Sequence, residues 1–181
     1  MAKIWRKAIE NGLKNLYSVI EDNSIFTEKE ICETCSILCA RKQKWHWLLP
    51  QEAEKLRDKM RIENKFGAFF FSGGKCPMLK NTHCSIYEDR PLECRLSPLS
   101  LYHTGGKLFW IIDMKCPYFK RYKNEKKFWK KVDVFISKIE PFFTSKIVKD
   151  LINISKAIQK FDPLIENKDF IIIKKFKSTL E

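Results

Sequence analysis

Along the first third of the chain, apolar positions recur every three or four residues and predict three helices. The first helix is expected over residues 3–21. The second should begin near Glu28, after a capping box that starts at Thr27. Pro50 suits the first turn of a third helix, which is expected to end near Asn64.

A strand and a hairpin are expected in the middle of the chain. The aromatic run within Lys65–Gly74 predicts a buried strand that ends in a turn. Leu99–Cys116 predicts a hairpin that turns at Gly105 and Gly106. Between them, Cys76–Pro98 shows no stable period and is expected to be a loop with short helical turns.

Two more helices are expected towards the C-terminus, capped by Asn124 and by Thr144 or Ser145. Residues 169–176 follow as either an added strand or a short extension into a partner. The whole pattern predicts a mainly α fold in a single domain over residues 1–181, with about five helices and a small antiparallel β-hairpin.

Seven cysteines are present, and their spacings are typical of metal ligands. In order they are Cys32, Cys35, Cys39, Cys76, Cys84, Cys94 and Cys116. The N-terminus shows no apolar leader, which predicts a cytoplasmic protein with reduced thiols and favours a metal or iron–sulfur site over disulfides. The metal-binding core is expected over about 28–117, next to the hairpin, and a helical part over about 122–181.

The spacing of the first three cysteines limits how they share a site. On one helix, Cys32, Cys35 and Cys39 fall within an arc of roughly 60°, but Cys32 and Cys39 are separated by roughly 10.5 Å of rise. Two of these thiolates can join Cys84 and Cys94, between which a loop can fold back. The expected main ligands are therefore Cys35, Cys39, Cys84 and Cys94.

Cys32, Cys76 and Cys116 are assigned to a second site or a supporting role. A histidine, a water or a substrate would complete a second site, and His46 and His83 are the nearest histidines in sequence. The commoner role of either imidazole is that of a surface or hydrogen-bonding group. Metal binding is also expected to supply the folding energy of the Cys76–Pro98 loop, which has little apolar periodicity.

Zinc and iron–sulfur clusters compete for a set of four thiolates. Structural zinc usually uses paired Cys-x-x-Cys knuckles, and this chain has one such pair, Cys32 and Cys35. The uneven spacing of the other cysteines favours an iron–sulfur cluster of the 4Fe–4S type, with zinc as the alternative.

The stretch from Cys84 to Arg95 resembles the Cys-x-Ile-Tyr-x-x-Arg-Pro-x-x-Cys-Arg block of the CxxCxxCC family of zinc- or iron-chelating proteins. The resemblance covers roughly Ile31–Pro117. One position departs from it, because the first of two adjacent cysteines in the family's first motif is Leu38 here. The family includes flagellin lysine methylases, so the resemblance implies S-adenosylmethionine only if a methylase role holds.

Arg90, Arg95 and Tyr87 belong to this block and are candidate outer partners of the metal ligands. Each can donate a hydrogen bond to a sulfur, and the arginines can offset thiolate charge. In the simpler interpretation, the two arginines form ion pairs with acidic residues of the same block, and the tyrosine only packs against its neighbours.

The formal net charge is +13, and much of the excess lies late in the chain. Lys120–Lys131 holds seven basic residues against Glu125 alone. This pattern allows a polyanion or protein partner on the C-terminal helices, although lysines on amphipathic helices are more typical of a solvated face. No stretch is apolar for long enough to span a bilayer.

Three functions follow from these observations. The first is an iron–sulfur protein with a redox or substrate-binding role. The second is a lysine methyltransferase of the flagellin-methylase type, although the six glycines do not form a glycine-rich cofactor fingerprint. The third is a zinc-stapled module that binds nucleic acid or protein. Whether the chain is an enzyme, and which residues would be catalytic, does not follow from the pattern.

Overall fold

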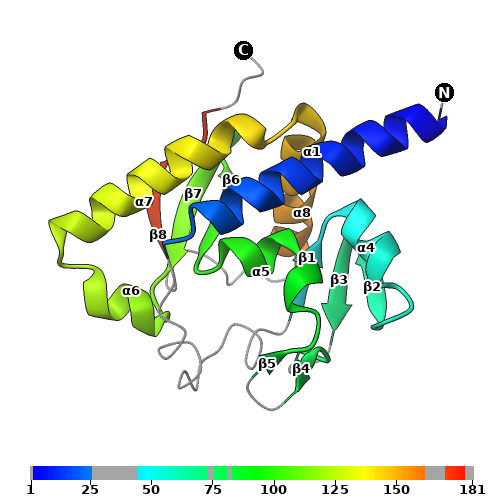
Figure 1. The fold of residues 1–181 in the computed structure, drawn as a ribbon, viewed down its shortest axis with the longest axis horizontal. Coiled ribbons are helices and arrows are strands. Elements are labelled where there is room, and N and C mark those ends of the chain that lie inside the picture. Colours follow the sequence, from blue (N-terminus) through cyan, green and yellow to red (C-terminus); the bar gives the residue numbers. More distant parts are fainter. Residues whose placement is uncertain (1, 26–44, 73–75, 81–82, 162–169, 178–181) are drawn as a thin grey trace.

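The computed structural model describes residues 2–25, 45–72, 76–80, 83–161 and 170–177. About half of these residues are helical and about a quarter lie in strands. The strands form two three-stranded antiparallel sheets and a two-stranded ribbon (Figure 1). The fold is therefore α+β, and the prediction of a mainly α fold with one small hairpin is wrong.

Helices and strands are interspersed along the described part of the chain (Figure 1). The helices are α1 (Ala2–Asp22), α4 (Pro50–Leu56), α5 (Leu92–Leu96), α6 (Pro117–Tyr122), α7 (Lys126–Ile139) and α8 (Ser145–Phe161), with short 3₁₀ turns η1 (Tyr87–Asp89) and η2 (Glu140–Phe142). The strands are β1 (Trp45–Leu48), β2 (Ile62–Lys65), β3 (Ala68–Ser72), β4 (Leu79–Lys80), β5 (His83–Cys84), β6 (Leu99–Thr104), β7 (Lys107–Asp113) and β8 (Phe170–Lys175).

The first sheet, in the order β1–β3–β2, accounts for much of the error in the predicted fold class. The third predicted helix ends at Leu56, and β2 begins at Ile62, where the sequence had indicated helix as far as Asn64. β2 reads Ile-Glu-Asn-Lys and lacks the alternation that identifies a strand, so its pairing with β3 determines its conformation. The β2–β3 turn places Phe66 and Gly67 at φ of 51° and 81°.

The second sheet has the order β6–β7–β8 and confirms the predicted hairpin. Gly105 and Gly106 form its turn with φ of 55° and 74°, values that glycine adopts without steric cost. β8 pairs antiparallel with β7, so the C-terminal segment is an added strand, one of the two predicted alternatives.

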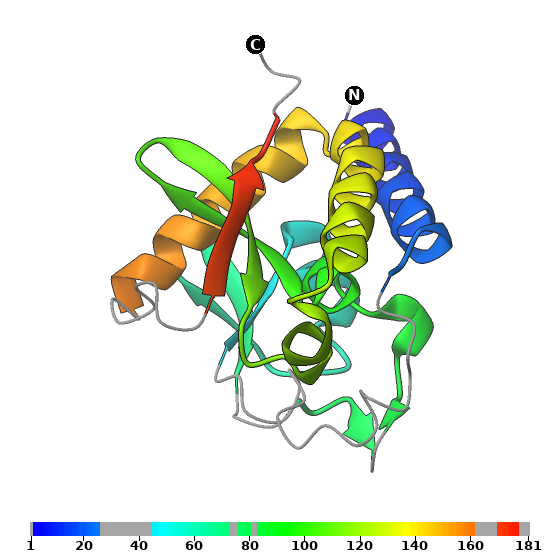
Figure 2. The ribbon, with the colours of Figure 1, turned by 90° about the vertical axis from the view of Figure 1, so that its left-hand side faces the viewer.

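The long helices agree with the sequence pattern. α1 and α7 lie side by side, as Figures 1 and 2 both show. The Thr144 hydroxyl accepts a bond from the Ile147 amide at 3.4 Å and caps α8. α7 starts one residue later than Asn124 predicts, because Glu125 occupies its N-cap position. The helix predicted near Glu28 lies outside the described residues.

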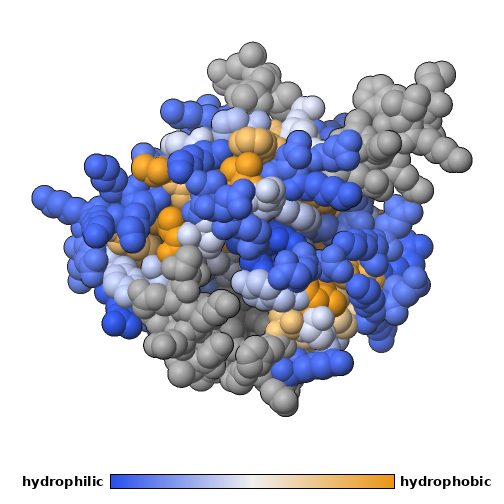
Figure 3. Space-filling view, viewed as in Figure 1, coloured by the Kyte–Doolittle hydropathy of each residue, from blue (hydrophilic) through white to orange (hydrophobic). Residues whose placement is uncertain are grey.

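The core lies between the helices α1, α7 and α8 and the sheet β6–β7–β8, where Trp110 and Phe119 are among the largest fully buried side chains. A smaller apolar cluster, the β1–β3 cluster, contains Leu48, Ala53, Leu56, Met60 and Phe71. On the face seen in Figure 3, hydrophobic residues form small separate patches within a mainly hydrophilic surface. Among the helices described here, none is long and apolar enough to cross a membrane.

Candidate metal centre

Four of the seven cysteines fall within the described residues, and all four are half-buried thiols. Cys76 precedes β4, Cys84 ends β5, Cys94 lies in α5, and Cys116 directly precedes α6. Figure 1 shows α5 in the middle of the molecule, with α6 and the β4–β5 ribbon below it. The four cysteines therefore come from segments that are distant from one another in sequence.

Of the four predicted main ligands, Cys84 and Cys94 lie within the described residues. Cys84 pairs with Leu79 across the β4–β5 ribbon, which brings the segments of Cys76 and Cys84 side by side. Within the described ranges, no three His, Cys, Asp or Glu side chains lie close enough together to hold a metal ion. Cys32, Cys35 and Cys39 lie outside the described residues.

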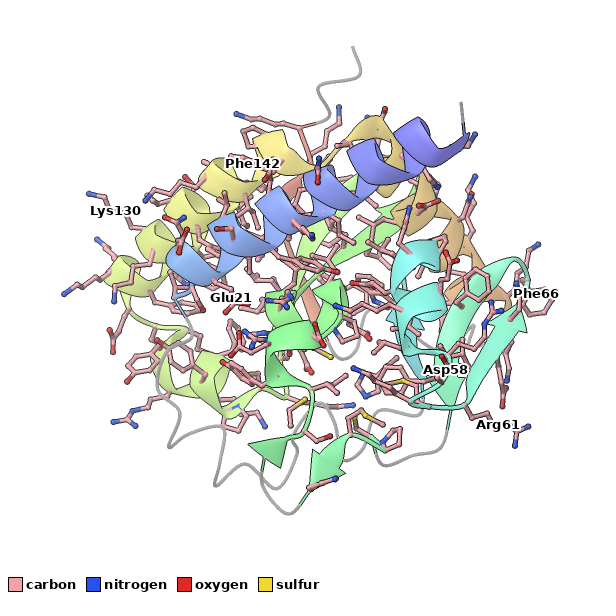
Figure 4. All side chains as sticks on the ribbon, turned by 45° about the vertical axis from the view of Figure 1, so that its right-hand side comes forward. Glu21, Asp58, Arg61, Phe66, Lys130 and Phe142 are labelled. Carbon is pink, nitrogen blue, oxygen red and sulfur yellow. The ribbon has the colours of Figure 1, made fainter. Side chains whose placement is uncertain are left out.

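The two arginines of the matched block both bind one carboxylate from a distant helix. Glu21, at the end of α1, accepts bonds from Arg90 Nη2 at 2.8 Å and from Arg95 Nη1 at 2.5 Å. Arg95 also donates to the carbonyls of Glu88 and Arg90, and its guanidinium lies 4.2 Å from the centre of the Tyr17 ring. Figure 4 labels Glu21 where α1 faces α5. We call Glu21, Arg90 and Arg95 the Glu21 cluster.

The Glu21 cluster positions the segment that carries Cys94. Arg95 follows Cys94 directly, so its bonds to α1 and to the preceding turn hold α5 in place. The ion pairs are with Glu21 and not with the acidic residues of the same block. Tyr87 is half-exposed and lies 3.8 Å beneath the Arg90 guanidinium, which is a packing role.

A buried carboxylate, Glu52 of α4, also anchors α5. Its Oε1 accepts bonds from the Leu92 amide at 2.6 Å and from the Tyr17 hydroxyl, and its Oε2 accepts a bond from the Leu49 amide at 2.8 Å. Sequence reasoning missed this residue, because a glutamate in the first helical turn is ordinarily a solvated capping group. Burial raises the pKa of Glu52 to about 7, and the hydrogen bonds from Tyr17, Leu49 and Leu92 oppose this only in part.

The raised pKa of Glu52 predicts a pH-dependent stability. The ordinary value is 4.5, so the unfolded chain loses this proton first, and the Glu52 contribution to stability falls as pH rises from about 4.5 to about 7. The loss is at most about 3 kcal/mol. Urea unfolding of the wild type and of Glu52→Gln, measured across this window, should show a difference in unfolding free energy that changes with pH. A constant difference would contradict the assignment.

A second buried carboxylate, Glu93, holds a buried histidine. Glu93 Oε2 lies 3.2 Å from His46 Nδ1 and accepts a bond from the Trp47 amide at 3.0 Å. His46 is 4% exposed, and its Nε2 is buried without a hydrogen-bond partner among the described residues. An orphaned imidazole nitrogen and a cysteine thiol, here Cys94 next to Glu93 on α5, are both donor types that zinc and iron sites use, so the chemistry of these residues fits a bound metal.

A basic groove of about 550 Å³ lies between the end of α1 and α7. Its polar lining includes Lys127, Lys130, Lys131, Lys138 and Asp22. Lys138 donates to the Asn23 side chain at 2.8 Å, and Lys130 projects away from the molecule in Figure 4. Three lysines of the predicted basic stretch, Lys127, Lys130 and Lys131, thus line this groove.

These features define a cysteine-rich α+β domain of the metal-binding class. The chain belongs to the CxxCxxCC family, whose model is described as a "putative zinc- or iron-chelating domain" and matches residues 31–133. This confirms the family resemblance, and the match encloses all seven cysteines. No curated protein and no solved structure gave a match.

Proposed function

We propose that this protein binds an iron–sulfur cluster, of the 4Fe–4S type, through its clustered cysteines. Cys35, Cys39, Cys84 and Cys94 are the proposed main ligands, and Cys32, Cys76 and Cys116 form a second site or support the first. The observation that carries this proposal is the family match over residues 31–133, which contains every cysteine of the chain. The uneven cysteine spacing favours iron and sulfide over a single zinc ion.

The described residues support a centre that exchanges electrons or binds a substrate. Half-burial of Cys76, Cys84, Cys94 and Cys116 keeps the thiols within reach of a metal delivered from solution while limiting contact with water. An iron–sulfur cluster supplies one-electron redox chemistry or an open iron for a ligand. The chain contributes rigidity, because the Glu21 cluster and Glu52 hold α5 on the protein scaffold.

Purification under anaerobic conditions tests the proposal. We expect a brown protein with iron and acid-labile sulfide in comparable amounts and a broad visible absorption that bleaches on reduction. Colourless protein that contains stoichiometric zinc and no sulfide would reject the cluster and leave the structural-zinc alternative.

The basic groove favours one second candidate, a zinc-stapled module that binds a polyanion. Four lysines from α7 line this groove, and Lys–phosphate contacts make nucleic-acid binding strongly dependent on salt. Binding of an oligonucleotide to the zinc-loaded protein, weakened steeply by added salt, would support this candidate over the first.

A further inference from the structure

We infer that His46 is a ligand of this domain's metal through its Nε2 atom, oriented by Glu93. The inference rests on the proposed metal-binding function and adds one residue, outside the cysteine motifs, to the metal site. Its basis is the burial of the ring, the carboxylate that holds one nitrogen, the orphaned second nitrogen, and the fact that the residues contacting the ring lie close to cysteines.

The ring of His46 is held in one orientation by its packing. It lies on β1, opposite Phe71 in the β1–β3 register, and stacks on the Phe71 ring with centroids 4.6 Å apart and planes 13° apart. Only 4% of the residue is exposed. An imidazole restrained in this way loses little conformational freedom when it binds a metal.

The bond to Glu93 determines which nitrogen is available. A carboxylate oxygen accepts hydrogen bonds, so the neutral tautomer that matches this contact has its proton on Nδ1 and its lone pair on Nε2. A carboxylate that holds the far nitrogen of an imidazole is the usual outer partner of a metal-bound histidine, since it fixes the tautomer and raises the basicity of the ligand. Glu93 also binds the Trp47 amide, which fixes the carboxylate itself.

The unpartnered Nε2 atom distinguishes His46 from a histidine that only packs in a core. A buried polar atom without a partner costs about 1–3 kcal/mol, so a histidine retained for packing would bond both ring nitrogens. Trp110 gives the contrast within this protein. Its one ring nitrogen donates to buried Glu140 at 2.7 Å, which leaves no polar atom of that ring unsatisfied.

The residues that hold the His46 ring belong to segments that carry cysteines. Glu93 directly precedes Cys94 on α5. Phe71 belongs to the β1–β3 cluster, against which Cys76 packs. The pattern CxxCxxCC names four cysteines, whereas this chain has Leu38 at one of those positions. A nitrogen ligand from His46 offsets the thiolate that the chain lacks.

The direct test is the coordination of the metal in anaerobically prepared wild-type protein. For a reduced iron–sulfur cluster, pulsed EPR on protein labelled with ¹⁵N-histidine should show a strongly coupled nitrogen that disappears in His46→Gln. If the wild type instead holds zinc, which rejects the proposed cluster, zinc-edge X-ray absorption should show a nitrogen shell at about 2.0–2.1 Å that His46→Gln loses.

A coordination sphere of sulfur alone in the wild type would overturn the inference without affecting the proposed function. A nitrogen signal that persists in His46→Gln would also overturn it, because another residue would then be the ligand. Protein that binds neither metal would reject both. The wild-type measurement does not depend on how well the variant folds.

A matched pair of variants tests the orienting role of Glu93. Glu93→Gln keeps the shape of the side chain but removes the charge, and metal affinity should fall about 10–100-fold. Glu140→Gln makes the same change at a buried carboxylate that bonds Trp110 and the Lys177 amide, so metal affinity should stay at the wild-type value. Equal affinities of the two variants would contradict an orienting role for Glu93.

Discussion

Replacement of Cys94 by serine is expected to abolish metal binding at the main site. A serine hydroxyl rarely loses its proton and is a poor ligand for iron or zinc, so metal content should fall to less than about a tenth of the wild-type value. Cys94 lies on α5 between Glu93 and Arg95, and both neighbours are bound to other elements. The position of the thiol is thus determined by the protein scaffold.

The measurement is iron, sulfide and zinc content together with the visible spectrum, each normalised to folded protein. Cys84→Ser should behave like Cys94→Ser, whereas Cys116→Ser is the control and should retain the main site. Circular dichroism should show unchanged helix content, because α1, α7 and α8 pack in the main core. Full metal retention in Cys94→Ser or Cys84→Ser would show that the ligands are grouped wrongly.

Replacement of Glu21 by alanine is expected to lower the free energy of unfolding by about 2–3 kcal/mol. The side chains of Arg90 and Arg95 are 13% and 6% exposed, so the variant would leave two nearly buried cations without their shared carboxylate. Glu21 is itself 37% exposed, which keeps the loss below that of a fully buried ion pair. Urea denaturation measures this difference.

Asp133→Ala is the matched control, because the Asp133 side chain is 65% exposed and its ion pair with Lys174 should contribute about 0.5 kcal/mol or less. Limited trypsin digestion adds a local readout, since the bond after Arg95 should become a cleavage site in Glu21→Ala and stay protected in Asp133→Ala. Equal stability losses in the two variants would mean that the Glu21 cluster does not anchor α5.

The Glu21 cluster changes one expectation from the sequence. The Cys76–Pro98 segment was expected to draw its folding energy from metal alone, because its apolar residues show no period. In the structure, Leu92 and Leu96 are fully buried, and carboxylates from α1 and α4 bind the segment. Non-local contacts therefore stabilise its second half, and a short-range pattern cannot reveal them.

The sequence by itself determined the long helices, the β6–β7 hairpin and the family. α1, α7 and α8 each bury one apolar stripe, so a 3.6-residue period is enough to identify them. Gly105 and Gly106 mark the hairpin turn because few other residues adopt positive φ there without strain. The cysteine block could be recognised from the sequence alone, because metal ligation depends on residue type and spacing.

Tertiary structure alone decided the first sheet and the setting of the candidate site. β2 is a strand because β3 pairs with it, and no local propensity marks the residues of β2. Glu21, Glu52 and Glu93 have their roles because they reach groups that lie 40 or more residues away in sequence. Their chemistry depends on burial and on the partner they meet, and only the folded chain provides both.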